Sequence, residues 1–91
     1  MKYEIKPSHT FKKELKQAQK RGLDISKLVS VVNALAEGKT LEAKYKDHAL
    51  TGNYKGYREC HIQPDWLLIY QYDNNELYLY LARTGTHSDL F

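Results

Sequence analysis

The sequence contains only one cysteine, Cys60, so the chain cannot form an internal disulfide. A lone cysteine favours a reducing compartment, and we expect Cys60 to be a small buried hydrophobic residue within a strand. No apolar run approaches the roughly 20 residues that a membrane-spanning helix needs. Pro7, His9 and a run of lysines follow Met1 too closely to leave room for a signal peptide. These absences predict a cytoplasmic protein without a membrane segment.

The sequence also lacks the motifs of several common enzyme classes. It has no glycine-rich loop for a nucleotide phosphate, and Ser88, although it stands beside His87, is not part of a nucleophile-elbow motif. A chain of 91 residues predicts one domain, residues 1–91, with a single two-layer core. Because such a core leaves little room for a deep cavity, we expect no bound cofactor.

Basic residues are concentrated in the first part of the chain. Residues 1–58 hold 13 of the 14 Lys and Arg residues but only 6 of the 11 Asp and Glu residues, a balance of +7 against −4 for the remainder. A basic region of this kind favours a polyanionic partner such as RNA or an acidic protein. The alternative is the solvated face of a helix. The lysines of that face are Lys12, Lys13, Lys16 and Lys20.

Two helices are predicted in the first half. A short alternating strand, residues 3–6, is followed by Ser8, which can cap a helix that ends at Gly22. Asp24 can cap a second helix, which ends at Gly38. The short link between the two helices predicts an antiparallel hairpin. The apolar stripe of the second helix comprises Ile25, Leu28, Val29, Val32, Leu35 and Ala36.

Strands are predicted in the second half, after residues 39–57, which lack a long period. The later half of that segment, residues 48–56, is predicted to be a loop, and it carries His48. The expected strands are 57–62, 66–72 and 77–82, with a turn at 73–75 and no defined element after Gly85. The fold class is therefore α+β: an N-terminal strand, an antiparallel helix hairpin, and an antiparallel β-meander with the helices packed on one face. In this fold we expect burial of Leu28, Val32 and Leu35 against Leu68 or Leu79.

Polar side chains that can move protons or bind phosphate gather at the ends of the predicted strands. His61 and Asp65 flank a turn, Arg83 and His87 follow the last strand, and His48 lies in the long loop. Loops and strand ends on a rigid sheet are where catalytic groups usually sit.

These side chains suit one reaction in particular. Histidine has an unperturbed pKa of about 6.5, so two histidines beside a phosphodiester could act as general base and general acid. Arg83 could bind the non-bridging oxygens, and Asp65 could orient a histidine. The set suits RNA cleavage through the neighbouring 2′-hydroxyl, which needs no metal. Phe91, Trp66 or Tyr54 could stack on an unpaired base, although Trp66 is better explained as a core residue.

A metal site is the second possibility for the same side chains. Three histidine nitrogens and one carboxylate form an acceptable zinc ligand set, here His48, His61, His87 and Asp65. These ligands come from separate segments without a compact motif, so zinc is the less favoured interpretation and we expect no metal. Any single histidine is more often structural, and we expect His9, near a helix start, to be exposed and without a role.

Two segments form long, specific motifs: residues 48–70 (HALTGNYKGYRECHIQPDWLLIY) and residues 83–91 (RTGTHSDLF). On these motifs the sequence resembles the YafQ branch of the RelE/ParE toxin superfamily. The resemblance covers the whole chain, although the N-terminal half is generic. It implies a toxin of a type II toxin–antitoxin system that cleaves messenger RNA in the ribosomal A site. It also implies a cognate antitoxin that binds and neutralises the toxin.

The resemblance implies roles for particular residues. By motif position, the catalytic residues of the family match His48, His61, Asp65 and His87. Positions that contact or orient RNA match Arg83 and Phe91. We expect His87 to act as general acid and His48 as general base. His61 and Arg83 would then contact the phosphate, and which histidine is the base stays open.

Two other functions stay open on the sequence. ParE-type relatives share the fold and poison DNA gyrase by binding it, without this histidine cluster. An inert domain that only binds an antitoxin is the third possibility. Cleavage of a defined message by purified protein with ribosomes distinguishes the first function from the other two.

Overall fold

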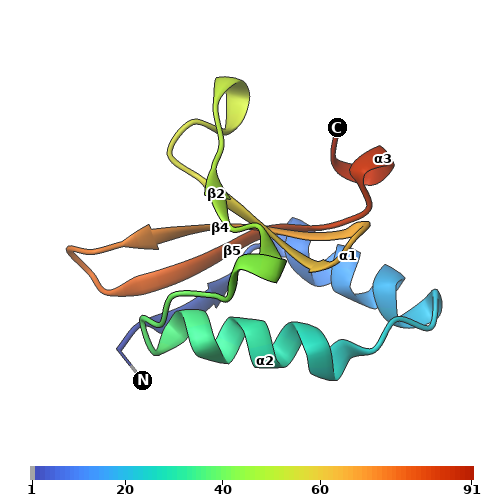
Figure 1. The fold of residues 1–91 in the computed structure, drawn as a ribbon, viewed down its shortest axis with the longest axis horizontal. Coiled ribbons are helices and arrows are strands. Elements are labelled where there is room, and N and C mark those ends of the chain that lie inside the picture. The colour runs from blue at the N-terminus through green and yellow to red at the C-terminus, as the bar shows by residue number, and fades with distance from the viewer. Residues whose placement is uncertain (1) are drawn as a thin grey trace.

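The computed structural model describes residues 2–91 and contains a five-stranded sheet. In chain order the elements are β1 Glu4–Pro7, α1 His9–Lys20, α2 Ile25–Ala36, the 3-10 helix η1 Ala43–Tyr45, β2 His48–Ala49, the 3-10 helix η2 Gly52–Tyr54, β3 Arg58–Gln63, β4 Trp66–Asp73, β5 Tyr78–Gly85 and α3 His87–Leu90. Helices α1 and α2 lie on one side of the sheet, whereas α3 and the loop that follows β2 rise on the other side (Figure 1). The predicted α+β class, with the helix hairpin on one face, is confirmed.

The strands are ordered β1-β5-β4-β3-β2 across the sheet. Strands β3, β4 and β5 form the predicted antiparallel meander. Strand β1 pairs with β5 in parallel, with Glu4 opposite Tyr78, so the first and last strands of the chain are neighbours. The sequence pattern predicted β1 but not its partner. The two-residue β2 extends the sheet at the opposite edge by pairing with β3.

The two long helices begin at the predicted caps. The side-chain oxygen of Ser8 accepts a hydrogen bond from the N–H of Phe11, and the carboxylate of Asp24 accepts one from the N–H of Ser26. Gly22 follows α1 with a φ of 81°, in the left-handed region that favours glycine. The chain can therefore reverse between the two helices within a few residues.

The core divides into one hydrophobic cluster on each face of the sheet. On the helix side, the predicted contact is confirmed, because one buried cluster contains Leu28, Val32, Leu35, Leu68 and Leu79. On the other side, α3 and the loop that follows β2 cover a smaller cluster of Leu67, Ile69, Ala82 and Leu90. Trp66 is a core residue as expected, with 2% exposed and its Nε1–H donating to the hydroxyl of Thr84.

Three segments differ from the sequence-based prediction. The predicted loop contains β2, because His48 and Ala49 find partners in β3 that lie about ten positions away. The last strand begins at Tyr78 and continues to Gly85, because its partner β4 is long enough to pair with it. The tail after Gly85 forms α3, which a local capping box stabilises. All three differences depend on strand pairing or helix capping, which hydrophobic periodicity does not reveal.

Two further expectations concern burial and membranes. Cys60 is fully buried in β3, and this burial raises the pKa of its thiol to about 12. It is therefore the small core residue that the sequence predicted. None of the helices within residues 2–91 has the length and hydrophobicity needed to cross a bilayer.

Candidate active site

Three histidines from three different elements meet beside the sheet. The ring centroids of His48 and His61 are 6.5 Å apart, and those of His61 and His87 are 5.6 Å apart. His48 lies opposite Glu59 of β3, and Glu59 lies opposite Ile69 of β4. Because cross-strand partners share a face, and Ile69 belongs to the cluster away from α1 and α2, the histidines are gathered on that second face.

Hydrogen bonds at Nδ1 fix the orientation of the first two rings. Nδ1 of His48 is 2.7 Å from the carbonyl oxygen of Lys46, and Nδ1 of His61 is 3.2 Å from that of Pro64. A carbonyl oxygen can only accept, so Nδ1 carries the hydrogen in both rings. In the neutral rings Nε2 is therefore the bare nitrogen, which is the form of histidine that accepts a proton.

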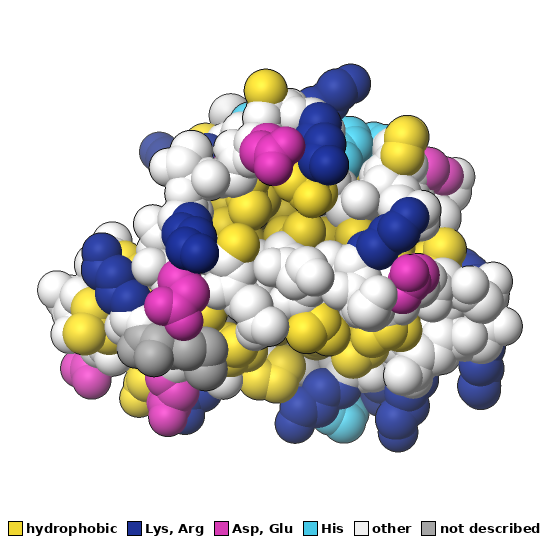
Figure 2. Space-filling model, turned by 60° about the horizontal axis from the view of Figure 1, so that its bottom comes forward, with side chains coloured by type: hydrophobic (Ala, Val, Ile, Leu, Met, Phe, Trp, Pro, Cys, Tyr) yellow, Lys and Arg dark blue, Asp and Glu magenta, His cyan; other side chains and the backbone are white. Residues whose placement is uncertain are grey.

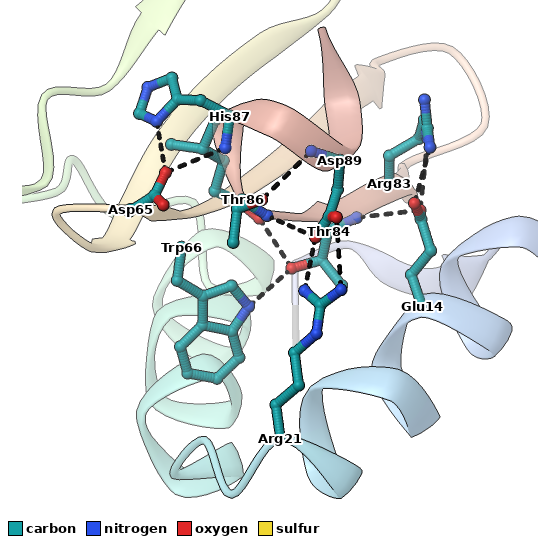
Figure 3. A network of polar contacts seen from close by, with 10 residues as sticks. Glu14, Arg21, Asp65, Trp66, Arg83, Thr84, Thr86, His87 and Asp89 are labelled. Carbon is teal, nitrogen blue, oxygen red and sulfur yellow. Dashed lines mark hydrogen bonds and ion pairs between the residues drawn. The ribbon is translucent and has the colours of Figure 1, made fainter.

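Asp65 orients the third ring. One carboxylate oxygen, Oδ1, accepts from the backbone N–H of His87 at 3.0 Å and from its ring Nδ1–H at 2.7 Å (Figure 3). These two bonds, the backbone one first, hold the pKa of Asp65 below its ordinary value. The sequence predicted that Asp65 could orient a histidine, and the geometry shows that this histidine is His87. Nε2 of His87 is again the nitrogen left for proton transfer.

The short helix that carries His87 is fastened to the rest of the molecule. The hydroxyl of Thr86 accepts from the N–H of Asp89, and a carboxylate oxygen of Asp89 accepts from the N–H of Thr86 at 3.0 Å. Arg21, at the end of α1, donates to the same carboxylate at 2.6 Å (Figure 3). The pKa of Asp89 is lowered, first by Arg21 and then by Thr86. The position of His87 thus depends on α1 as well as on Asp65.

Glu59 adds a carboxylate to the cluster that the sequence analysis did not assign. Its side chain is 6% exposed, and Oε1 lies 3.5 Å from Nε2 of His48 and 3.7 Å from Nε2 of His61. The signal was present, because Glu59 precedes His61 by two positions in a strand and so shares its face. The contact with His48 could not be predicted, because it depends on the pairing of β2 with β3.

Arg83 faces α1 rather than the histidines. Its Nη2 is 2.7 Å from one carboxylate oxygen of Glu14, its Nε is 3.3 Å from the other, and its Nη1 donates to the hydroxyl of Tyr54 at 3.2 Å. These bonds, those with Glu14 first, raise the pKa of Arg83 above its ordinary value. Figure 3 shows the Arg83–Glu14 pair and the His87–Asp65 pair on opposite sides of α3.

Phe91 belongs to the same group as Arg83. Its ring lies edge-on to the ring of Tyr54, with centroids 5.9 Å apart, and 65% of the residue is exposed. Tyr54 therefore connects the guanidinium of Arg83 to an exposed aromatic ring at the end of the chain. Of the residues proposed from the sequence, those with acid–base chemistry form one cluster, and Arg83 and Phe91 form a second group around Tyr54.

An open cleft of about 830 Å³ adjoins the histidine cluster. Its walls come from α2, η1 and the turn between β3 and β4, and its lining residues are Lys27, Ser30, Lys44, Tyr45, Lys46, His61, Ile62, Gln63, Pro64 and His87. Three of these are lysines, and the described lining contains no Asp or Glu. Figure 2 shows a hollow on the α2 side of the molecule, with hydrophobic side chains in its floor and both basic and acidic side chains near its rim. The cleft thus suits a polyanion.

Residues 3–91 match a protein family described as the bacterial toxin of type II toxin–antitoxin systems, YafQ. The mRNA interferase toxin YafQ of Escherichia coli strain K12 is 44% identical over 89 residues, which cover 97% of this chain and 95% of that protein. A crystal structure of the E. coli DinJ–YafQ toxin–antitoxin complex contains a chain that is 42% identical, with a TM-score of 0.89 and coverage of 100% of this chain and 99% of that one.

A third similar protein bears on metal binding. A crystal structure described as a metal-bound toxin from Helicobacter pylori is 47% identical, with a TM-score of 0.92 and coverage of 98% of this chain and 99% of that one. Within residues 2–91 of the present chain, no three His, Cys, Asp or Glu side chains are arranged to hold a metal ion.

Proposed function

The chain belongs to the YafQ family of bacterial type II toxin–antitoxin toxins, and we propose that it is an endoribonuclease that cleaves messenger RNA in the ribosomal A site. The observation that carries this proposal is the cluster of three histidine rings beside a lysine-lined cleft. Its toxin domain would span residues 1–91 and act in the cytoplasm, where translating ribosomes are found. Cleavage of translated messages would stop protein synthesis.

The proposed reaction is an attack of a 2′-hydroxyl on the neighbouring phosphate. A general base removes the proton of the hydroxyl, the freed oxygen attacks phosphorus, and the bond to the 5′-oxygen breaks as a general acid protonates it. The products are a 2′,3′-cyclic phosphate and a 5′-hydroxyl end. His48 is the proposed base and His87 the proposed acid, each acting through Nε2. Asp65 supports His87, because its bond to Nδ1 fixes the orientation of the ring. Its negative charge also stabilises the ring when His87 is protonated.

Contacts to the phosphate are proposed for His61 and Arg83. His61 lies between the other two rings, at the position where a phosphate between base and acid would be bound. A guanidinium has five N–H groups, and three of those of Arg83 are used by Glu14 and Tyr54. Two N–H groups thus remain for a phosphate oxygen. Phe91, exposed and backed by Tyr54, would stack on a base of the message.

The cleft beside the cluster offers a path for the RNA backbone. Lys27, Lys44 and Lys46 would neutralise successive phosphates on one side of the scissile bond. His61 and His87 are among the residues that line the same cleft, so a strand bound there would pass close to the proposed catalytic groups. No step of the proposed reaction uses a metal, because histidine nitrogens can themselves accept and donate the protons that it moves.

Two macromolecular partners are proposed. An antitoxin protein would bind and neutralise the toxin, as the DinJ–YafQ complex exemplifies for the E. coli relative. The ribosome would present the message, and the exposed lysine face of α1 would contact its RNA. A gyrase-binding toxin of the ParE type is not supported, because the family match over residues 3–91 and the curated relatives are YafQ toxins.

The function can be tested with purified protein, ribosomes and one defined message. We expect cuts within the codon held in the A site, with 5′-hydroxyl ends, and no comparable cutting when the same message lacks ribosomes. His87→Gln serves as the matched inactive control, because glutamine can form hydrogen bonds but cannot transfer a proton. A message that stays intact with programmed ribosomes would refute the proposed activity.

A further inference from the structure

Glu59 is a buried carboxylate that the proposed reaction does not yet use. Among residues 2–91 it is the only acidic residue in the buried class. It lies in the middle of the sheet face that carries the histidines, in one cross-strand row with His48, Ile69 and Arg83. Buried carboxylates are rare unless they are paired, so its partners need an explanation.

The carboxylate of Glu59 is incompletely satisfied. Its second oxygen, Oε2, is buried and has no hydrogen-bond partner within residues 2–91. On the β4 side its neighbour is the apolar Ile69, and Arg83, the next residue of the row, is bonded to α1 instead. The titratable groups that face Glu59 are therefore His48 from β2 and His61 of its own strand. An unpaired buried charge is destabilising, so Glu59 weakens the fold unless one of these rings compensates for it.

Both rings present Nε2 to the same oxygen of Glu59. The distances of 3.5 Å and 3.7 Å are longer than a good hydrogen bond but within the range of an ion pair. Because Nδ1 of each ring already donates to a carbonyl, the neutral rings turn their lone pairs toward a negative oxygen. This arrangement is repulsive until a proton is added to one Nε2, after which it becomes attractive. The geometry is thus prepared for proton uptake.

We propose that Glu59 is a positioning residue that places Nε2 of His48 beside Nε2 of His61 and supplies the negative charge for the proton taken up there. The proposal rests on the proposed function, because that proton comes from the 2′-hydroxyl of RNA. The O–H bond breaks, and the proton passes to Nε2 of His48, the proposed base. The electron pair of the oxygen forms the bond to phosphorus as the bond to the 5′-oxygen breaks. Glu59 exchanges no atom in this step. It stabilises the imidazolium as it forms, by electrostatic attraction.

The test uses Glu59→Gln, which keeps the size of the side chain and removes its charge. We expect single-turnover cleavage on programmed ribosomes to slow about ten- to a hundredfold, by analogy with the loss seen when the carboxylate behind a metal-bound histidine is removed. The melting temperature should stay the same or rise, because an unpaired buried charge is lost. The pH dependence of the cleavage rate should also change shape. Full activity in this variant, or a melting temperature that falls together with activity, would overturn the proposal.

Two further variants and one measurement without RNA complete the test. Glu59→Asp retains the charge and should recover much of the lost rate, whereas Glu76→Gln, in the exposed turn before β5, should change nothing. In the free protein, the ring ¹⁵N signals of His48 and His61 over about pH 5–8 should change together in Glu59→Gln, and those of His87 should not. Unchanged signals for the first two rings would refute the role of Glu59. If Glu59→Gln changes both signals together but the wild-type protein cuts no RNA, the coupling through Glu59 is supported and the proposed function is overturned instead.

Discussion

Arg21 and Asp89 are 68 positions apart in the sequence, yet Nη1 of Arg21 lies 2.6 Å from a carboxylate oxygen of Asp89. Arg21 immediately follows α1, and Asp89 lies in α3, two positions after His87. A second bond, 3.3 Å long, joins Nη2 to the other carboxylate oxygen. The end of the helix hairpin is thereby fastened to the short helix that carries the proposed general acid. Through this contact, the position of α3, and therefore of His87, depends on the fold of the N-terminal half.

We predict that Arg21→Gln slows cleavage several-fold while the fold of the protein persists. Without the ion pair, α3 keeps its capping box, its bond to Asp65 and the packing of Leu90, but it loses its link to α1, so His87 is held less firmly. The measurement is single-turnover cleavage together with circular dichroism. Lys39→Gln is the matched control, because Lys39 is exposed and lies outside both the lysine face of α1 and the lining of the cleft. Equal rates in the two variants would show that the contact does not position the site.

The same pair predicts how stability depends on pH. The folded state lowers the pKa of Asp89, so its contribution is present above the ordinary carboxyl pKa of about 3.9 and is lost as the pH falls through the lower folded value. Asp65 shifts in the same direction. We therefore expect the free energy of unfolding of the wild type to decrease below about pH 4. Arg21→Gln should show a smaller decrease, since the main cause of the shift at Asp89 is removed. Parallel pH curves for the two proteins, measured by urea unfolding, would contradict this.

A third prediction concerns the packing of α2 on the sheet. Val32 is buried in the cluster beneath β4 and β5, whereas Val29 on the same helix is 47% exposed. Val32→Asp should lower the free energy of unfolding by about 3–5 kcal/mol, because it buries an unpaired charge. Val29→Asp introduces the same charge at the surface and should cost less than about 1 kcal/mol. Urea denaturation of both variants measures the difference, and similar losses at the two positions would refute the packing.

Much of the framework could be predicted because its determinants are local. Ser8 and Asp24 cap the two helices where their side chains indicated, and the apolar stripe of α2 faces the strands except at Val29, which is exposed. The apolar run beginning at Trp66 became a central, covered strand. Caps, periodicity and turn residues act over a few positions, so the sequence reveals them directly.

The unpredicted parts of the site depend on contacts between distant segments. Strand β2 has only two residues and exists because it pairs with β3, so the neighbourhood of His48 and Glu59 was not visible beforehand. Arg83 was expected beside a phosphate, but its contact with Glu14 joins residues 69 positions apart. Glu59 is an intermediate case: strand alternation placed it with His61, but its burial follows only from the whole sheet.

We predict that the lysine face of α1 contributes to ribosome binding through phosphate contacts. Replacement by alanine of each contributing lysine should reduce the slope of log affinity against log salt by about one unit, because one fewer counterion is released. The exposed candidates are Lys12, Lys13, Lys16 and Lys20. Arg21, which follows these lysines in the sequence, is a less suitable phosphate contact, because its guanidinium is bonded to Asp89. If charge reversal across the face leaves ribosome affinity unchanged at every salt concentration, these lysines are only a solvated surface.

The last prediction concerns the proposed acid and combines all parts of the site. His87→Ala should slow single-turnover cleavage by about 10²–10⁴-fold, the range expected for the loss of one general acid. Ribosome affinity and melting temperature should change little, because the side chain of His87 is 54% exposed and its removal opens no core cavity. His87→Gln should be nearly as slow, and both variants should fail to arrest growth on induction.

Metal dependence is tested on the same cleavage assay, because a ring that transfers a proton and a ring that binds a metal respond differently to chelation. The Helicobacter pylori relative is described as metal-bound, so the control is informative. Chelation with EDTA of the free metals, on ribosomes kept intact by buffered magnesium, should leave the wild-type rate unchanged. Loss of cleavage that added zinc restores would instead assign the three histidines to a metal.

If His87→Ala cuts at near the wild-type rate, proton donation belongs to another group. A variant that arrests growth without cutting RNA would return a gyrase-type mechanism to consideration. Only a slow, folded, ribosome-binding variant satisfies the geometry in which Asp65 holds Nδ1 and leaves Nε2 of His87 to protonate the leaving oxygen.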